Sequence, residues 1–155
     1  MLTDAQKVTI KADILANADT LAAYNIGNLD ALEKLYNAAA SPAFVVWRTD
    51  LQPDEYREAI VWTEVDALTT GSKYRIWEWL TMGMTAPIDA SKANVRQGIA
   101  DCWASNTTTR TNLLAAAKRN ASRIEKLFAT GTGSTASPAV MAVEGPINYM
   151  EFIGL

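Results

Sequence analysis

The spacing of hydrophobic and polar residues predicts a mainly helical protein. Two segments near the N-terminus carry apolar side chains at helical spacing and start at residues that cap helices. Thr3 and Gln6 match a capping box, which predicts a helix over residues 3–16. Asn28 is a preferred N-cap residue, which predicts a second helix over residues 29–39. The segment between these two helices is rich in turn residues and is predicted as a connection.

Further helices are predicted in the middle of the chain. Pro53 suits the first turn of a helix, where the missing amide hydrogen costs nothing. The run AFVVW at residues 43–47 is either a short strand or a buried stretch of chain, because periodicity does not separate these alternatives. The predicted helices of this region cover residues 53–62, 64–68, 73–83 and 91–104.

The segment KYRIWEWLTMG at residues 73–83 has the unusual property of being apolar on two sides. Trp77 and Trp79 are two residues apart, so they point about 200° from each other around a helix axis. Such a helix is either central in its own bundle or shared with a neighbouring subunit. The two predicted faces are Ile76, Trp79 and Leu80 on one side and Tyr74, Trp77 and Met84 on the other.

The longest helix is predicted over residues 110–129. Its apolar positions alternate between three- and four-residue spacing, which is typical of a stripe in a helix bundle. These positions are Leu114, Ala117, Ala121, Ile124 and Phe128. Gly131 and Gly133 then end the helix and open a flexible hinge over residues 131–137.

The C-terminal segment beyond this hinge is apolar and strand-like. Its two apolar runs flank Gly145 and Pro146, so they form either a small hairpin or one extended arm that is broken at the turn. The predicted fold class is therefore mainly α: a five- to six-helix bundle with a C-terminal extended arm or short β-hairpin. We expect the bundle to cover residues 1–130 and the hinge and docking arm to cover residues 131–155.

Composition excludes several functional classes. The net charge of −3 argues against a nucleic-acid-binding domain, and the absence of histidine rules out Ser–His, Cys–His and His–metal sites. Cys102 is the one cysteine, and we interpret it as a buried, inert thiol. No apolar stretch reaches about 20 residues, so no membrane contact is expected. We therefore expect no catalytic residue, metal site or cofactor, and no enzyme activity.

Charge is distributed unevenly along the chain. Residues 48–66 are strongly acidic and residues 110–126 are strongly basic. One interpretation is that both are solvated faces or that they pair inside one subunit. The other is a head-to-tail contact, in which the acidic face of one subunit meets the basic helix of the next and closes a ring. The candidate interface residues are Asp54, Glu55, Glu58, Arg119, Arg123 and Lys126.

Three stretches of the sequence carry a resemblance to a known group of proteins. They are SPAFVVW from Ser41, KANVRQGI from Lys92 and RIEKLFATGTGSTASPAVMAVEGPINY from Arg123. Together they resemble a small protein family of tailed bacteriophages and prophages, over nearly the whole chain. The resemblance implies a virion or morphogenesis protein that is assembled in the host cytoplasm. The C-terminal MEFIGL departs from the family, whose members often end in a short polar tail.

The outline of a helical domain, a hinge and an arm is similar to that of head–tail connector (adaptor) proteins. This likeness implies a structural ring, commonly twelvefold, below the portal protein and joined to tail or stopper proteins, with packaged DNA passing nearby without sequence-specific contact. The arm would dock on a neighbour by strand addition, or else fold back over its own bundle. The expected anchors of a docked arm are Val140, Val143, Ile147, Tyr149 and Phe152. Alternatives are a stopper or tail-completion protein, a non-virion assembly factor and, least favoured, a small lytic enzyme.

Overall fold

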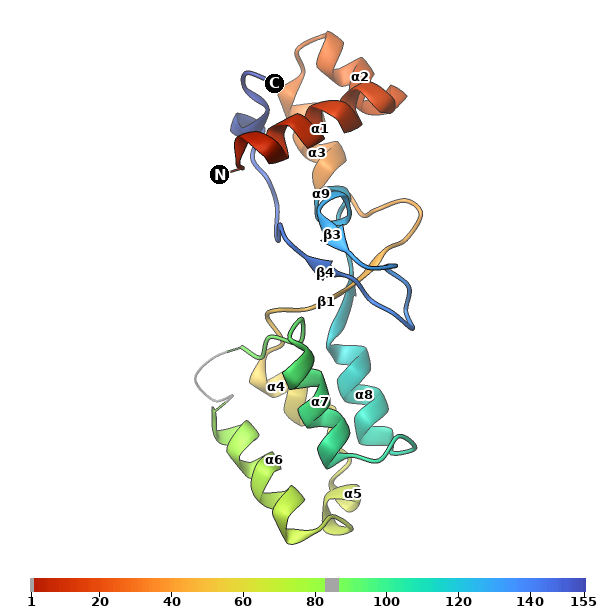
Figure 1. The fold of residues 1–155 in the computed structure, drawn as a ribbon, viewed down its shortest axis with the longest axis vertical. Helices are drawn as coiled ribbons and strands as arrows, with labels where there is room; N and C mark the ends of the chain where they lie inside the picture. The colour runs from red at the N-terminus through yellow and green to blue at the C-terminus, as the bar shows by residue number, and fades with distance from the viewer. Residues whose placement is uncertain (1, 83–86) are drawn as a thin grey trace.

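A computed structural model describes residues 2–82 and 87–155 of the chain. Figure 1 shows an elongated molecule with two helical lobes and a narrow waist. We call the lobe that holds both chain ends the terminal lobe and the lobe built from the helices of residues 53–116 the distal lobe. The waist between the two lobes consists of the short strands and the helix of residues 123–127. The described chain is 54% helical and has two small antiparallel sheets, which confirms the predicted mainly α fold class.

The terminal lobe is built on three N-terminal helices: α1 (Asp4–Ala16), α2 (Ala18–Asn25) and α3 (Leu29–Asn37). Both predicted caps are confirmed, because Thr3 and Gln6 form the capping box of α1 and the Asn28 side chain accepts from the Ala31 amide. The prediction of an irregular connection between α1 and α3 is wrong, because this segment contains helix α2. This helix is stabilised by burial of Thr20, whose hydroxyl donates to the Ile14 carbonyl of α1 at 3.3 Å.

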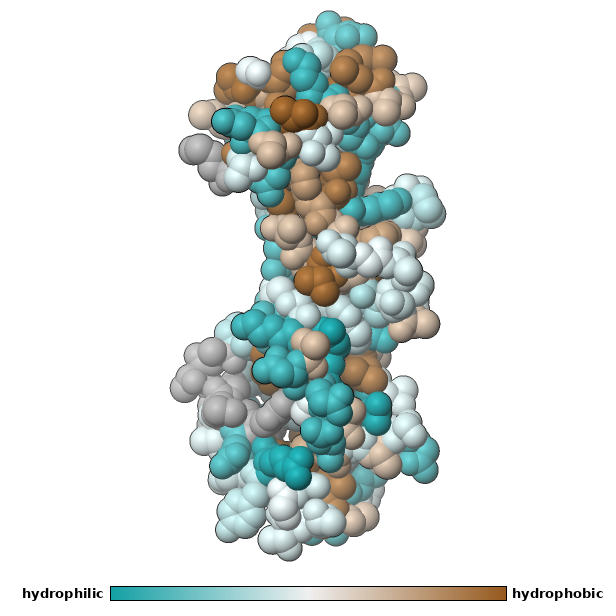
Figure 2. Space-filling model, in the orientation of Figure 1, coloured by the Kyte–Doolittle hydropathy of each residue, from teal (hydrophilic) through white to brown (hydrophobic). Residues whose placement is uncertain are grey.

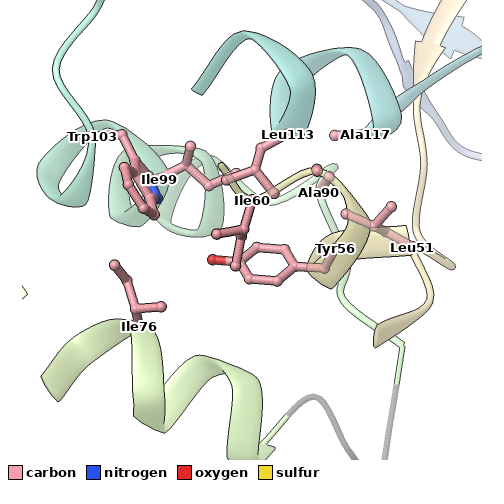
Figure 3. Packing of buried hydrophobic residues seen from close by; sticks show 10 residues of the cluster. Leu51, Tyr56, Ile60, Ile76, Ala90, Ile99, Trp103, Leu113 and Ala117 are labelled. Atoms are coloured by element: carbon pink, nitrogen blue, oxygen red, sulfur yellow. The ribbon is translucent and has the colours of Figure 1, made fainter. Parts of the chain in front are cut away.

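The distal lobe contains five helices: α4 (Pro53–Glu58), α5 (Trp62–Asp66), α6 (Thr70–Met82), α7 (Ala93–Cys102) and α8 (Thr108–Ala116). Its core includes Trp103, which is fully buried (Figure 3). Ile76 points from α6 toward Trp103, and it is only 3% exposed. Helix α6 therefore buries Ile76, which belongs to one of its two predicted apolar faces, in this core. The Trp79 and Leu80 side chains and Met84, which belong to the predicted faces, lie outside the described residues.

The waist joins segments that are distant in the sequence. Strand β1 (Val45–Trp47) confirms the strand interpretation of AFVVW and pairs antiparallel with β2 (Lys118–Asn120), with Val46 opposite Arg119. Strand β3 (Ala129–Thr130) pairs with β4 (Val140–Met141). Ala139 links the two sheets, because its carbonyl accepts from the Trp47 amide at 3.0 Å and its amide donates to Val45 at 2.9 Å.

The prediction of one continuous helix over residues 110–129 is wrong. Helix α8 ends at Ala116, strand β2 follows, and a separate short helix, α9 (Arg123–Leu127), starts at Ser122. Hydrogen bonds to β1 hold residues 118–120 extended, and a capping box between Ser122 and Glu125 begins the new helix. The apolar stripe of the predicted long helix is therefore divided among the distal lobe, the waist and the terminal lobe.

Each lobe has its own hydrophobic core. Leu113 and Ala117 pack in the distal lobe, whereas Ile124 packs with Ile10 and Ile14 in the terminal lobe. The boundary predicted at residue 130 stays a prediction, but the core of the terminal lobe contains buried residues from both sides of it. These residues are Ile10, Ile14, Ala23, Leu32, Tyr36, Ile124, Ile147 and Phe152.

Candidate assembly surfaces

The C-terminal arm, residues 142–155, lies along its own chain from the waist to the terminal lobe (Figure 1). Ile147 is 7% exposed, and the Asn37 side chain bonds both of its backbone groups, at 2.8 and 2.9 Å. Phe152 is 2% exposed, and its ring centroid lies 5.5 Å from that of Tyr36. Within one copy of the protein the arm therefore folds back onto its own terminal lobe. Two of the predicted anchors, Ile147 and Phe152, are core residues of that lobe.

The remaining predicted anchors lie closer to solvent. Val140 in β4 and Tyr149 are exposed, and Val143 is partly buried against the core of the terminal lobe. Tyr149 begins a 3-10 helix, η1 (Tyr149–Phe152), and its amide donates to Glu33 of α3 at 2.8 Å. Past η1, the Leu155 carbonyl accepts from the Tyr24 hydroxyl at 2.6 Å. The end of the arm is therefore bonded to two helices of the terminal lobe.

The predicted hinge glycines, Gly131 and Gly133, lie in close contact with other parts of the chain instead of forming a free link. Gly133 is buried, and its carbonyl accepts from the Val45 amide at 2.7 Å. Its φ is +66°, and a Cβ at this position would lie 2.1 Å from the Phe44 ring. Gly131 has a φ of +127°, and a Cβ there would approach the Ala139 backbone to 3.0 Å. Both glycines therefore sit in a packed turn against the waist, where only glycine fits without rearrangement.

Gly133→Ala is expected to destabilise the chain by about 2–3 kcal/mol, because the methyl group meets Phe44 and the left-handed backbone is strained. Gly145→Ala is the matched control, since Gly145 has a φ of +83° but nothing within 4 Å of the added carbon. That control should lose about 1 kcal/mol. Urea unfolding of both variants measures the difference, and equal losses would contradict the packed turn.

Arg119 is tied to carboxylates of its own chain. Its guanidinium donates to Glu125 through two bonds of 2.6 and 2.7 Å and lies 3.4 Å from Glu144. Glu125 is 3% exposed and also accepts from the amides of Ser122 and Gly145. Burial alone raises the pKa of Glu125, but the Arg119 guanidinium and the two amides lower it more strongly, to about 2. This buried ion pair holds α9, β2 and the arm together.

Arg123 is held in the same manner at the terminal lobe. It pairs with Asp13 at 3.1 Å and Asp19 at 2.8 Å, and its guanidinium lies 5.1 Å from the Tyr36 ring centroid. The Lys126 ammonium lies 5.8 Å from the Phe44 ring. The predicted interface roles of Arg119 and Arg123 therefore compete with bonds inside the subunit, and reversing either charge would disturb the fold itself.

The predicted acidic interface lies on the distal lobe. Glu55 receives two hydrogen bonds from Arg48, at 2.7 and 2.8 Å, and these lower the pKa of Glu55. Asp54 and Glu58 are exposed on α4. Among the described residues, the carboxylate partners of Arg119 and Arg123 come from outside residues 48–66, so the acidic segment does not pair with these two arginines in one copy.

Large hydrophobic side chains are exposed at both ends of the molecule, and two of them, Tyr74 and Trp77, belong to a face that the sequence pattern predicts as apolar. On the distal lobe they are Trp62, Tyr74 and Trp77, and on the terminal lobe Val8, Leu15, Ile26, Tyr149, Met150 and Ile153. Figure 2 shows apolar residues gathered over the terminal lobe on the visible face. Ile26 is 76% exposed, and Tyr74 and Trp77 are each 69% exposed. Exposed apolar side chains that form a contiguous patch mark surfaces that contact other molecules.

The clefts of the described surface offer little chemistry. A cleft of about 550 Å³ between α1, α3 and α9 is lined by Asp13, Asp19, Arg123 and Lys126, but its carboxylates are already paired with Arg123. No set of three potential metal-ligating side chains was found within residues 2–82 and 87–155. In the same part of the chain, every helix is too short or too polar to cross a membrane.

Comparisons with protein-family models, with curated proteins and with solved structures give no match to this chain.

Proposed function

We propose that the protein is a structural subunit of a tailed-phage particle, a head–tail connector that forms a ring below the portal and joins head to tail. The observation that carries this proposal is the exposure of large hydrophobic side chains at both ends of an elongated molecule. A subunit that bridges two neighbours needs a contact surface at each end, and in this proposal the exposed apolar side chains of the two lobes supply such surfaces. The phage context comes from the sequence resemblance.

The architecture also supports a role as a rigid spacer. Two stretches of chain, which carry β1 and β2, connect the lobes and pair with each other, and the Glu125–Arg119 pair and the Asn37–Ile147 bonds hold the arm along the waist and the terminal lobe. In this proposal the ring contacts are made by the lobe surfaces, and the arm contributes its exposed side chains, Met150 and Ile153, rather than its buried ones. A stopper or tail-completion role would use the same surfaces with a different neighbour.

Cosedimentation with the purified portal protein of the same phage tests this function. The wild-type chain is expected to cosediment with portal rings, because its exposed apolar groups become buried there. Ile153→Glu places a charge on the terminal-lobe surface, where the residue is 54% exposed, and should reduce binding at least tenfold. Ala136→Glu, at an exposed position between β3 and β4, is the control for added charge. A wild-type chain that stays in the supernatant would contradict the proposal.

A further inference from the structure

Helix α6 presents an uncovered stripe that has the pattern of a helix–helix contact. Tyr74 and Trp77 are each 69% exposed, and Thr70 and Thr81 on the same stripe are also exposed. The intervals between these residues are four, three and four, which is the spacing of a coiled-coil seam. With about 100° per residue, the four positions fall within about 60° of each other around the helix axis. The stripe is about 16 Å long.

The stripe does not belong to the core of the distal lobe. Ile76, the α6 side chain that points toward Trp103 in the core of the distal lobe, lies about 130° away from the centre of the stripe. Helix α6 therefore uses one side for its own fold and leaves the opposite side, which carries two large aromatic rings, without a cover among the described residues.

Charged residues flank the stripe on both sides. Lys73 and Glu78 are exposed and lie about 70° from its centre, in the positions that flank a coiled-coil seam. Lys73 precedes Glu78 by five residues. In two parallel helices that share a seam, this offset places Lys73 of one helix beside Glu78 of the other. Two α6 helices side by side in parallel would thus form two Lys73–Glu78 pairs. In an antiparallel arrangement Lys73 would lie on the same side as Lys73 of the second copy, and Glu78 on the same side as Glu78 of the second copy. Like charges would then repel on both sides.

We propose that α6 pairs in parallel with α6 of a second copy of this chain, through the seam Thr70, Tyr74, Trp77 and Thr81. The contact is twofold symmetric, since each copy supplies the same residues. Two tyrosines and two tryptophans bury at most about 600–1,000 Å², below the about 1,200 Å² of a typical stable interface. The free protein is therefore a weak, reversible dimer. This inference concerns the chain without portal, so it stands or falls separately from the proposed function.

Sedimentation velocity over a concentration series tests the dimer. The wild-type chain should dimerise, and Trp77→Ala should abolish dimerisation while circular dichroism stays unchanged, because the Trp77 side chain is mostly exposed. Lys73→Glu and Glu78→Lys should each weaken dimerisation about tenfold or more, since each turns two attractive pairs into repulsive ones. The double variant, with both substitutions, should restore the wild-type affinity.

Arg75→Glu is the matched control, because it makes the same charge change on the same helix, about 130° from the stripe. It should dimerise like the wild type. A wild-type chain that is monomeric at all concentrations overturns the proposal. Single charge variants that dimerise as well as the wild type, or a double variant that fails to recover, overturn the parallel seam.

Discussion

Glu125→Gln is expected to reduce the free energy of unfolding by about 3–5 kcal/mol at pH 7. The substitution keeps the shape of the side chain but removes the charge that pairs with Arg119, and losing the ion pair of a buried carboxylate is costly, although the Arg119 side chain itself is 30% exposed. It also weakens the acceptor for the amides of Ser122 and Gly145. Urea unfolding at pH 7 measures the loss. Glu144→Gln is the control, because that carboxylate is 36% exposed and lies 3.4 Å from Arg119, and it should lose less than about 1 kcal/mol.

The effect of Glu125 should disappear in acid. Its pKa falls from 4.5 to about 2 on folding, so the stability that it contributes is fully present above pH 4.5 and is lost as the pH falls toward 2. The shift corresponds to about 3 kcal/mol. The difference in unfolding free energy between the wild type and Glu125→Gln should therefore shrink between pH 4.5 and pH 2. A difference that stays constant over this range would show that the Glu125 charge does not stabilise the fold.

Phe152→Ala is expected to destabilise the chain by about 3–5 kcal/mol, although the residue lies close to the C-terminus. Phe152 is 2% exposed and packs against Tyr36, so its removal leaves a cavity in the core of the terminal lobe. Thermal or urea unfolding measures the loss. Tyr149→Ala, in the same 3-10 helix but 40% exposed, should cost about 1 kcal/mol or less.

Equal and small losses for Phe152→Ala and Tyr149→Ala would mean that the arm is not part of the core in the free protein. The arm would then be available to a neighbour through its buried anchors, as the sequence pattern first indicated. The comparison thus separates an arm that stabilises its own lobe from an arm that waits for a partner.

Local signals in the sequence predict the starts of several helices. The capping box of Thr3 and Gln6, the Asn28 cap and Pro53 each mark a helix start that the structure has. These signals succeed because a cap depends on residues that are adjacent in the chain. The start of α9 was also marked locally, because the capping box of Ser122 and Glu125 lies inside the predicted long helix.

Non-local contacts account for what the sequence did not predict. Lys118, Arg119 and Asn120 are extended because they pair with β1, about 70 residues earlier in the chain. The burial of Ile147 depends on the Asn37 side chain, which bonds its backbone from a distant helix. Residues 131–137 have the composition of a link, and only the position of Phe44 makes Gly133 part of a packed turn. Tertiary context decided each of these cases.

Quantitative mass spectrometry of purified phage particles tests the central proposal most directly. As a ring subunit below the portal, the protein should be present in intact particles at about one copy per portal subunit, and it should stay with the particles after washing in high salt. A chain that is abundant in infected cells but absent from purified particles would contradict a structural role in the virion.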